Sequence, residues 1–327
     1  MAKPVPVEGL EAETPLEEAA AKLLPPLLAD AFARELAVRA GEPELGIHDM
    51  RVAMKRFREM FRLLRPALPK KKHARHLEWI EELNDALGDV RDMDVLVKHL
   101  VQLAGDDKAA PAISSLLERL LTKRDVASQE LIETLDDLHE RGVRAKLDGL
   151  ILRMAVLREA GTLGELVRTE IRDRLERVRR RWRAAHKKAT GETFHSTRIA
   201  NKRLRYSIEP FRELLPHAVG PIYDTASAFH DALGNLHDGD VLLETARTAL
   251  LATPADERAP LLRLLGRAEE ERRTHLEELA KLGDTLEGLE WDELSRAVAP
   301  AASAPIAAGT TNEPAKESAQ TPERAAT

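Results

Sequence analysis

The sequence contains no cysteine, few aromatic residues and no long hydrophobic run. The absence of cysteine excludes a disulfide framework, a thiolate zinc site and a cysteine nucleophile, and it suits a reducing compartment. No stretch of about 18 apolar residues occurs, and the N-terminus lacks a basic segment followed by an apolar one. We therefore expect a protein that is neither membrane-spanning nor exported, and place it in the cytoplasm.

Aromatic residues make up 3% of the chain, and only 17 of its 327 residues are glycine. These values are low for a β-rich fold, whereas the dominance of Ala, Leu, Arg and Glu is typical of long packed helices. The composition therefore predicts an all-α protein. Residues 1–14 and the Ala-, Pro-, Thr- and Ser-rich segment 299–327 are expected to be disordered.

Net charge is also small: 50 Lys and Arg against 56 Asp and Glu give −6. That total by itself predicts mild repulsion from polyanions. The cations are nevertheless concentrated, because residues 48–76 contain ten Lys or Arg and two acids, and residues 166–188 contain ten and three. An acidic protein therefore carries two strongly basic segments.

The basic residues that follow His48 share one face if this segment is a helix. At about 100° per residue they fall within an arc of about 100°, next to an apolar arc that would face a core. Like charges three and four residues apart repel, and few acids relieve that repulsion. A charge run is usually a solvated helix face, but this geometry favours a binding face for an anion.

The same pattern occurs twice. His48-x-x-Arg51-x-x-x-Lys55-Arg56-x-Arg58 recurs 147 positions later as His195-x-x-Arg198-x-x-x-Lys202-Arg203-x-Arg205. Segments 83–96 and 229–242 also match, at an offset of 146, and both contain Leu-Gly followed by Asp-x-Asp-Val. This period exceeds that of a solenoid, so we expect two helical bundles side by side, over residues 15–160 and 161–298.

Within the two copies the pattern predicts helices over 16–40 and 163–189, His/Arg helices over 48–66 and 195–215, and charge-rich helices over 111–136 and 257–282. Gly88 and Gly234 are expected to end a third helix in each copy, and Asp92 and Asp238 to begin a fourth.

The repeated aspartates are interpreted as helix caps and partners of arginines rather than as metal ligands. They are Asp92, Asp94, Asp238 and Asp240. Arg56 and Arg203 lie off the cationic stripe, and we expect them to meet these aspartates.

The duplicated His-x-x-Arg-(x)3-Lys-Arg-x-Arg helix, followed by Leu-Gly-x-x-Arg/His-Asp-x-Asp-Val, resembles the CHAD family over about residues 15–295. The resemblance implies two four-helix bundles related by pseudo-twofold symmetry, with a basic surface that binds inorganic polyphosphate, and an association with polyphosphate granules in bacteria. Members are often fused to a CYTH domain, whose Glu-x-Glu-x-Lys motif is absent from this sequence. The chain is thus similar to a stand-alone member, and we expect a binding protein rather than an enzyme.

Polyphosphate has no bases and no fixed shape, so a receptor needs a row of cations. Arginine forms forked contacts with phosphate oxygens, lysine supplies a mobile charge, and histidine can donate as imidazolium. We expect the two repeated helices to face each other and line one groove. The predicted binding residues are His48, Arg51, Lys55, Arg56, Arg58, Arg62, His195, Arg198, Lys202, Arg203 and Arg205. Neither a cofactor nor a metal is expected, and granule proteins are further candidate partners.

Three other functions stay open at this stage. Nucleic acid is attracted to any cationic stripe, but single-strand binders usually add stacking aromatics, which are scarce near the motif. Metal-dependent phosphohydrolysis is suggested by the dipeptides His48-Asp49, His230-Asp231 and His237-Asp238. A purely structural helical scaffold would leave the basic residues without a ligand.

Overall fold

The computed structural model describes residues 9–68, 70–154, 161–211 and 216–289. Within these ranges the chain is helical and has no strand beyond one isolated bridge, which confirms the predicted all-α class. No helix in the described ranges is long and apolar enough to cross a membrane. The segment 299–327, predicted to be disordered, lies outside the described residues.

The first half forms α1 (Leu16–Phe32), α2 (Glu35–Arg39), α3 (Asp49–Leu63), α4 (Lys70–Ala104), α5 (Pro111–Glu140) and α6 (Val143–Met154). The second half forms α7 (Leu163–Lys187), α8 (Gly191–Ile208), α9 (Pro216–Ala252) and α10 (Ala259–Glu287). Short turns of helix, η1 to η5, cover Pro43–His48, Arg65–Ala67, Gly105–Ala109, Glu209–Phe211 and Ala255–Glu257. The predicted helix over 16–40 is interrupted after Phe32, and the predicted His/Arg helices correspond to α3 and α8.

Each His/Arg helix buries its apolar arc as the pattern predicts. On α3, Phe57, Met60 and Phe61 are fully buried.

The start of α7 is set by a capping box. The Thr162 side chain accepts a hydrogen bond from the Glu165 backbone N–H, and the Glu165 carboxylate accepts one from the Thr162 backbone N–H.

The predictions that Gly88 and Gly234 end helices, and that Asp92 and Asp238 cap new ones, are wrong. All four residues lie inside long continuous helices, α4 with 35 residues and α9 with 37. An internal glycine costs about 1 kcal/mol relative to alanine, but Gly88 is buried where the Arg51 guanidinium meets the helix backbone. Tertiary packing of the helix therefore overrides the local stop signal.

The two halves are joined at their first helices by a reciprocal contact. The Leu16 N–H donates to the Gly161 carbonyl (3.1 Å), and the Leu163 N–H donates to the Thr14 carbonyl (2.9 Å). Leu163 and Gly161 stand 147 positions after Leu16 and Thr14, so the same bond is made in both directions between equivalent residues of the two halves. This is the geometry of an isologous contact about a twofold axis. Leu10, inside the segment expected to be disordered, is buried.

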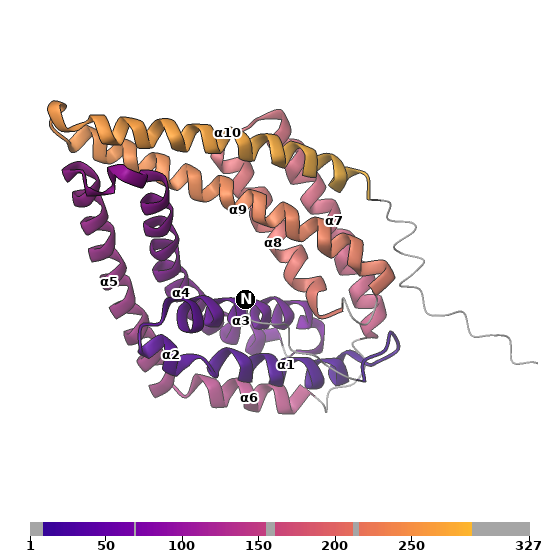
Figure 1. Ribbon diagram of the computed structural model, residues 1–327. Coiled ribbons are helices and arrows are strands. Elements are labelled where there is room, and N and C mark those ends of the chain that lie inside the picture. Colours follow the sequence, from indigo (N-terminus) through magenta and orange to yellow (C-terminus); the bar gives the residue numbers. More distant parts are fainter. Residues whose placement is uncertain (1–8, 69, 155–160, 212–215, 290–327) are drawn as a thin grey trace, which may run out of the picture.

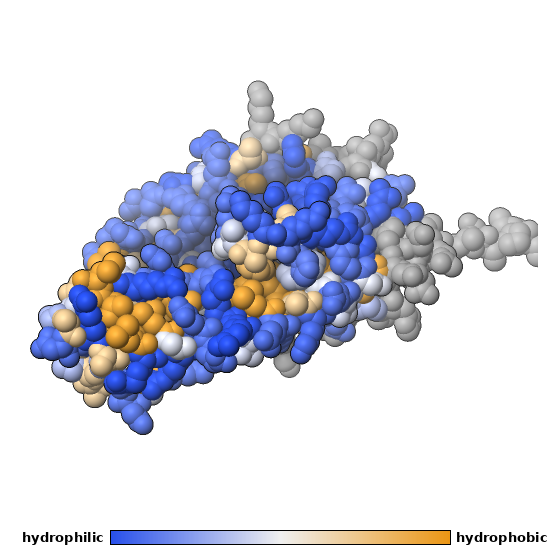
Figure 2. All heavy atoms as spheres, turned by 90° about the horizontal axis from the view of Figure 1, so that it is seen from above, coloured by the Kyte–Doolittle hydropathy of each residue, from blue (hydrophilic) through white to orange (hydrophobic). Residues whose placement is uncertain are grey.

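The hydrophobic core does not divide at the boundary between the halves. One large cluster includes residues of both, and a smaller one joins the far ends of α4 and α5 to those of α9 and α10. Figure 1 shows these two helix pairs meeting at one end of the molecule, with α3 and α8 nearer its middle. Seen from above in Figure 2, the surface is mostly hydrophilic, with a hydrophobic patch toward the end where α9 and α10 join.

Candidate anion-binding site

The cationic faces of α3 and α8 lie against each other. Lys55 of α3 is repelled by Lys202 and Arg198 of α8, and burial together with this repulsion lowers the pKa of Lys55 well below its usual value. The pKa of Lys202 is lowered to about 8, by burial and by the charges of Arg58, Arg51 and Arg198. Among the described residues, neither ammonium group has a hydrogen bond or an ion pair. The contact therefore concentrates positive charge that the nearby Asp92 and Glu59 offset only in part.

Arg51 is held in position by α4. Its Nη1 donates to the Gly88 carbonyl (3.0 Å) and to Asp92 Oδ1 (2.7 Å). Its Nε is buried, as is that of Arg198, and neither has a hydrogen-bond partner in the described part of the chain. Asp92 thus orients one arginine of the predicted set while both guanidinium groups keep an unused donor.

Two of the other three repeated aspartates, Asp94 and Asp240, pair with arginines that the sequence reasoning did not single out, whereas Asp238 forms no ion pair with the described residues. Asp94 accepts from Arg124 of α5 at 3.0 Å, and Asp240 accepts from Arg272 of α10 at 2.6 Å. These equivalent ion pairs tie α4 to α5 and α9 to α10. The expectation of arginine partners is confirmed for them, whereas the expectation that Arg56 and Arg203 would be those partners is wrong.

Arg56 is buried in an ion pair between the two halves. Its Nε and Nη2 each donate to Glu209 at 2.9 Å, and both side chains are almost fully buried. The structure therefore places this predicted binding residue in the interior. Arg203 is exposed and lies within the fields of Arg62, Arg174 and Glu59.

The buried acid Glu59 compensates part of the stripe. Its carboxylate accepts from Arg62 Nη1 at 2.9 Å and from Arg58 Nη2 at 3.2 Å, and it lies 3.6 Å from Arg174 Nη1. Arg62 also pairs with Glu81. The signal for this role was visible in the sequence, because Glu59 is one of two acids in a run of ten cations.

At the other side of the lysine pair, α8 and α9 contribute Arg205 and His230. Arg205 Nε donates to Ser227 Oγ at 3.1 Å, and its guanidinium carbon lies 4.9 Å from the ring centroid of Tyr206. Burial and the neighbouring cations, Arg205 first among them, lower the pKa of His230 to about 3. His230 is therefore neutral at pH 7, and its buried Nδ1 has no hydrogen-bond partner in the described residues.

A family model for the CHAD domain matches residues 22–247, most of the chain. The chain belongs to the CHAD family.

Two solved structures resemble it. The crystal structure of the CHAD domain from the plant Ricinus communis matches with a TM-score of 0.67 and 22% identity, over 89% of this chain and 98% of that one. PptA from Streptomyces chartreusis matches with a TM-score of 0.61 and 15% identity, over 82% of this chain and 99% of the other. No curated protein sequence matches.

The repeated histidines of this CHAD domain lie at the N-terminal ends of the cationic faces. His48 is half-buried, and burial together with the charge of Arg91 lowers its pKa. His195 is exposed, with its ring centroid 5.6 Å from that of His237. Arg91 and His237 are equivalent positions of the two repeats, 146 residues apart. Arg91 is the neighbour of His48, and His237 is the neighbour of His195.

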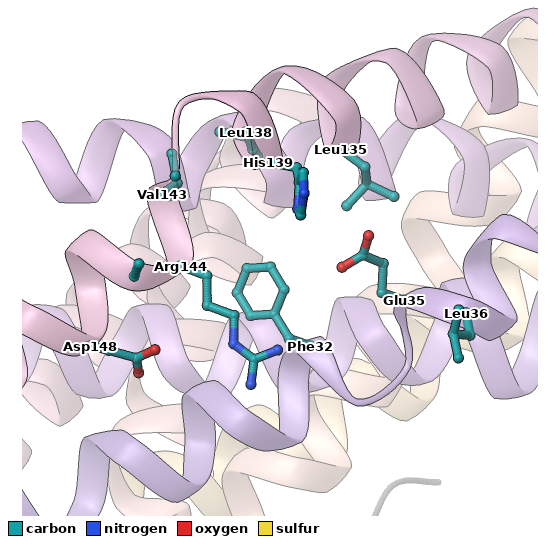
Figure 3. Close-up of a pocket in the computed structure, with 11 residues that line it drawn as sticks. Phe32, Glu35, Leu36, Leu135, Leu138, His139, Val143, Arg144 and Asp148 are labelled. Carbon is teal, nitrogen blue, oxygen red and sulfur yellow. The ribbon is translucent and has the colours of Figure 1, made fainter.

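The His-Asp dipeptides do not assemble a metal site in the described residues, where no group of three or more His, Asp or Glu side chains is arranged to hold an ion. A cavity of about 490 Å³ lies away from the lysine pair, between α2, α5 and α6. Figure 3 shows the acids Glu35 and Asp148 at this cavity, with Arg144 beside the ring of Phe32. Its mixture of acids and apolar residues does not suit a phosphate chain.

Proposed function

We propose that this CHAD domain binds inorganic polyphosphate at the contact between α3 and α8, where Lys55 and Lys202 face each other and neither forms an ion pair with the described residues. Burying a charge in a protein is costly unless an opposite charge compensates it. A phosphate chain threaded between the two helices supplies that charge. The uncompensated lysine pair is the observation that carries the proposal.

The surrounding arginines are arranged for such a ligand. Arg51 and Arg198 keep buried Nε donors without partners among the described residues, and guanidinium groups form strong charge-assisted bonds with phosphate oxygens. Arg205 stands on the same side as His230, a neutral donor or acceptor. We take Arg58 and Arg62 as a second row whose charge Glu59 partly neutralises.

The aromatic side chains near the lysine pair favour a phosphate chain over single-stranded nucleic acid. Tyr206 is 4% exposed, and the Arg205 guanidinium lies over both its ring and that of Tyr223. Phe57 and Phe61 are fully buried. Bases stacked on aromatic faces supply much of the affinity of single-strand binders, and none of these rings is exposed.

Titration of the purified full chain with long-chain polyphosphate, at several salt concentrations, tests the proposal. Binding should weaken steeply as salt rises, because each phosphate contact releases counterions. In the variant Arg51→Gln/Lys55→Gln/Arg198→Gln/Lys202→Gln, the slope of log affinity against log salt should shrink by about 3. An unchanged slope would contradict the proposed site.

The matched control is Arg119→Gln/Lys123→Gln, which removes two exposed cations of α5. It should bind polyphosphate as tightly as the wild type, whereas Lys55→Gln/Lys202→Gln should bind it more weakly. RNA of equal total charge is the competitor: efficient displacement of polyphosphate by RNA would favour the nucleic-acid function instead.

We further propose binding without turnover and localisation to polyphosphate granules. A fluorescent fusion of the full chain should collect on granules, and the Lys55→Gln/Lys202→Gln form of that fusion should remain diffuse. Phosphate released from polyphosphate in the presence of Mg²⁺ or Mn²⁺, and lost on His237→Ala, would contradict the absence of turnover.

A further inference from the structure

Part of the first basic segment lies outside the α3–α8 contact. Lys72 and Arg75 belong to the charge run of residues 48–76, but they stand on α4 rather than on α3. With His76 and Trp79 of the same helix, and Lys146 and Arg153 of α6, they line a pocket of about 450 Å³. This size falls within the range of about 300–1,000 Å³ that is common for small-ligand sites.

Trp79 forms the apolar wall of this pocket and is 8% exposed. The Arg75 guanidinium carbon lies 5.2 Å from its ring centroid and Lys146 Nζ lies 5.5 Å away. Arg141 approaches the same ring at 5.6 Å. The ring quadrupole holds cations at such distances, so the indole positions three cations together and is itself covered by them.

Positive charge in the pocket exceeds what the protein neutralises. Arg141 is paired with Glu82 and Asp137. Lys146 Nζ donates to the Arg141 backbone carbonyl at 2.6 Å, which satisfies a donor without neutralising the charge. Lys72, Arg75 and Arg153 have no ion pair or hydrogen bond from their charged groups to the described residues, and no acid lines the pocket. The four cations named in this pocket, Lys72, Arg75, Lys146 and Arg153, therefore lack counterions.

The Trp79 pocket is separate from the lysine pair. Trp79 precedes Gly88 by nine residues, which is about 2.5 turns and places the two residues on opposite faces of α4. Gly88 and Asp92 contact Arg51 at the α3–α8 site, whereas Trp79 faces α6 and the end of α5. A ligand at one position does not occupy the other.

We propose that the Trp79 pocket is a second anion-binding site, which takes a short inorganic oligophosphate. Several unpaired cations around one cavity match a compact ligand with several negative charges, and arginine forks fit phosphate oxygens. His76 Nδ1 donates to the Lys72 carbonyl at 2.6 Å, which orients its ring beside Trp79. Because the indole face is occupied by cations, the site recognises phosphate and does not stack a base.

Sodium tripolyphosphate is the probe, added to the full chain and followed by calorimetry and by tryptophan fluorescence. The experiment uses the Lys55→Gln/Lys202→Gln background, so that the contribution of the α3–α8 site is reduced. Tripolyphosphate should still bind and should change the emission of Trp79. Adding Arg75→Gln/Lys146→Gln to this background should weaken binding at least tenfold, while adding the equally charged Arg119→Gln/Lys123→Gln should change it less than twofold.

Trp79→Phe should abolish the fluorescence response while circular dichroism shows a folded chain. The proposal is overturned if Arg75→Gln/Lys146→Gln leaves tripolyphosphate affinity unchanged, or if the fluorescence response survives in Trp79→Phe. Loss of binding on Lys55→Gln/Lys202→Gln alone would support the α3–α8 site and overturn the second one. Binding that is weakened only by Arg75→Gln/Lys146→Gln would support the Trp79 pocket and contradict the α3–α8 site. The two proposals can therefore fail separately.

Discussion

Replacing Lys202 by glutamine tests whether the contact between α3 and α8 holds a buried charge without a counterion. The pKa of Lys202 is lowered from 10.5 to about 8. Burial is the largest cause, and repulsion by Arg58 and Arg51 adds to it. A shift of this size corresponds to about 3 kcal/mol in favour of the neutral amine in the folded chain. The free protein therefore carries a charge that destabilises it.

The sign of the pH dependence follows from the two pKa values. The unfolded chain keeps this proton up to about pH 10.5, while the folded chain releases it near pH 8. Within that window the unfolded state binds more protons, so the stability of the wild type rises with pH. Below pH 8 the destabilisation is fully present. Lys202→Gln should therefore be more stable than the wild type by up to about 3 kcal/mol at neutral pH, and this difference should vanish above the window.

Denaturant unfolding of both proteins across this pH range, followed by circular dichroism, measures the difference. Titrating groups that do not interact with Lys202 cancel, and relief of the repulsion on Lys55 changes stability in the same direction. Saturating polyphosphate should reverse the order at neutral pH, since a ligand that binds the folded wild type more tightly stabilises it more. A variant that is less stable than the wild type, by an amount independent of pH, would give Lys202 a structural role and refute the reasoning.

Three further substitutions probe buried contacts of the chain by equilibrium unfolding. Glu209→Gln should cost about 3–5 kcal/mol, because it removes the carboxylate charge to which the buried Arg56 guanidinium donates two hydrogen bonds; a loss below about 1 kcal/mol would contradict this. Gly283→Ala should cost about 1–3 kcal/mol despite the better helix propensity of alanine, since the added methyl would overlap Trp182; a stabilised variant would show that the indole can move. The wild type should lose stability as pH falls from 6.5 toward 3, because His230 must be protonated against its lowered pKa; His230→Gln should lose less, and identical pH profiles would contradict the assignment.

Helix periodicity predicted the cationic faces correctly but could not assign a partner to each cation. Spacing along one helix places Arg51, Lys55 and Arg58 on one side. It does not reveal that Glu209, 153 residues away, neutralises Arg56. Local stop signals failed for a related reason at Gly88, because the burial of α4 against other helices outweighs a propensity cost of about 1 kcal/mol.

By itself the sequence determined the helical class, the repeat of 146–147 positions and the concentration of cations on two equivalent helices, because these depend on composition and on short-range periodicity. Only the tertiary structure decided which cations are neutralised and which are not. Ion pairs form between residues distant in the chain, and burial changes the energy of a charge only once the helices have packed. Arg56 is paired directly with the Glu209 carboxylate, whereas among the described residues Lys55 and Lys202 form no ion pair and are only partly offset by the more distant Asp92 and Glu59.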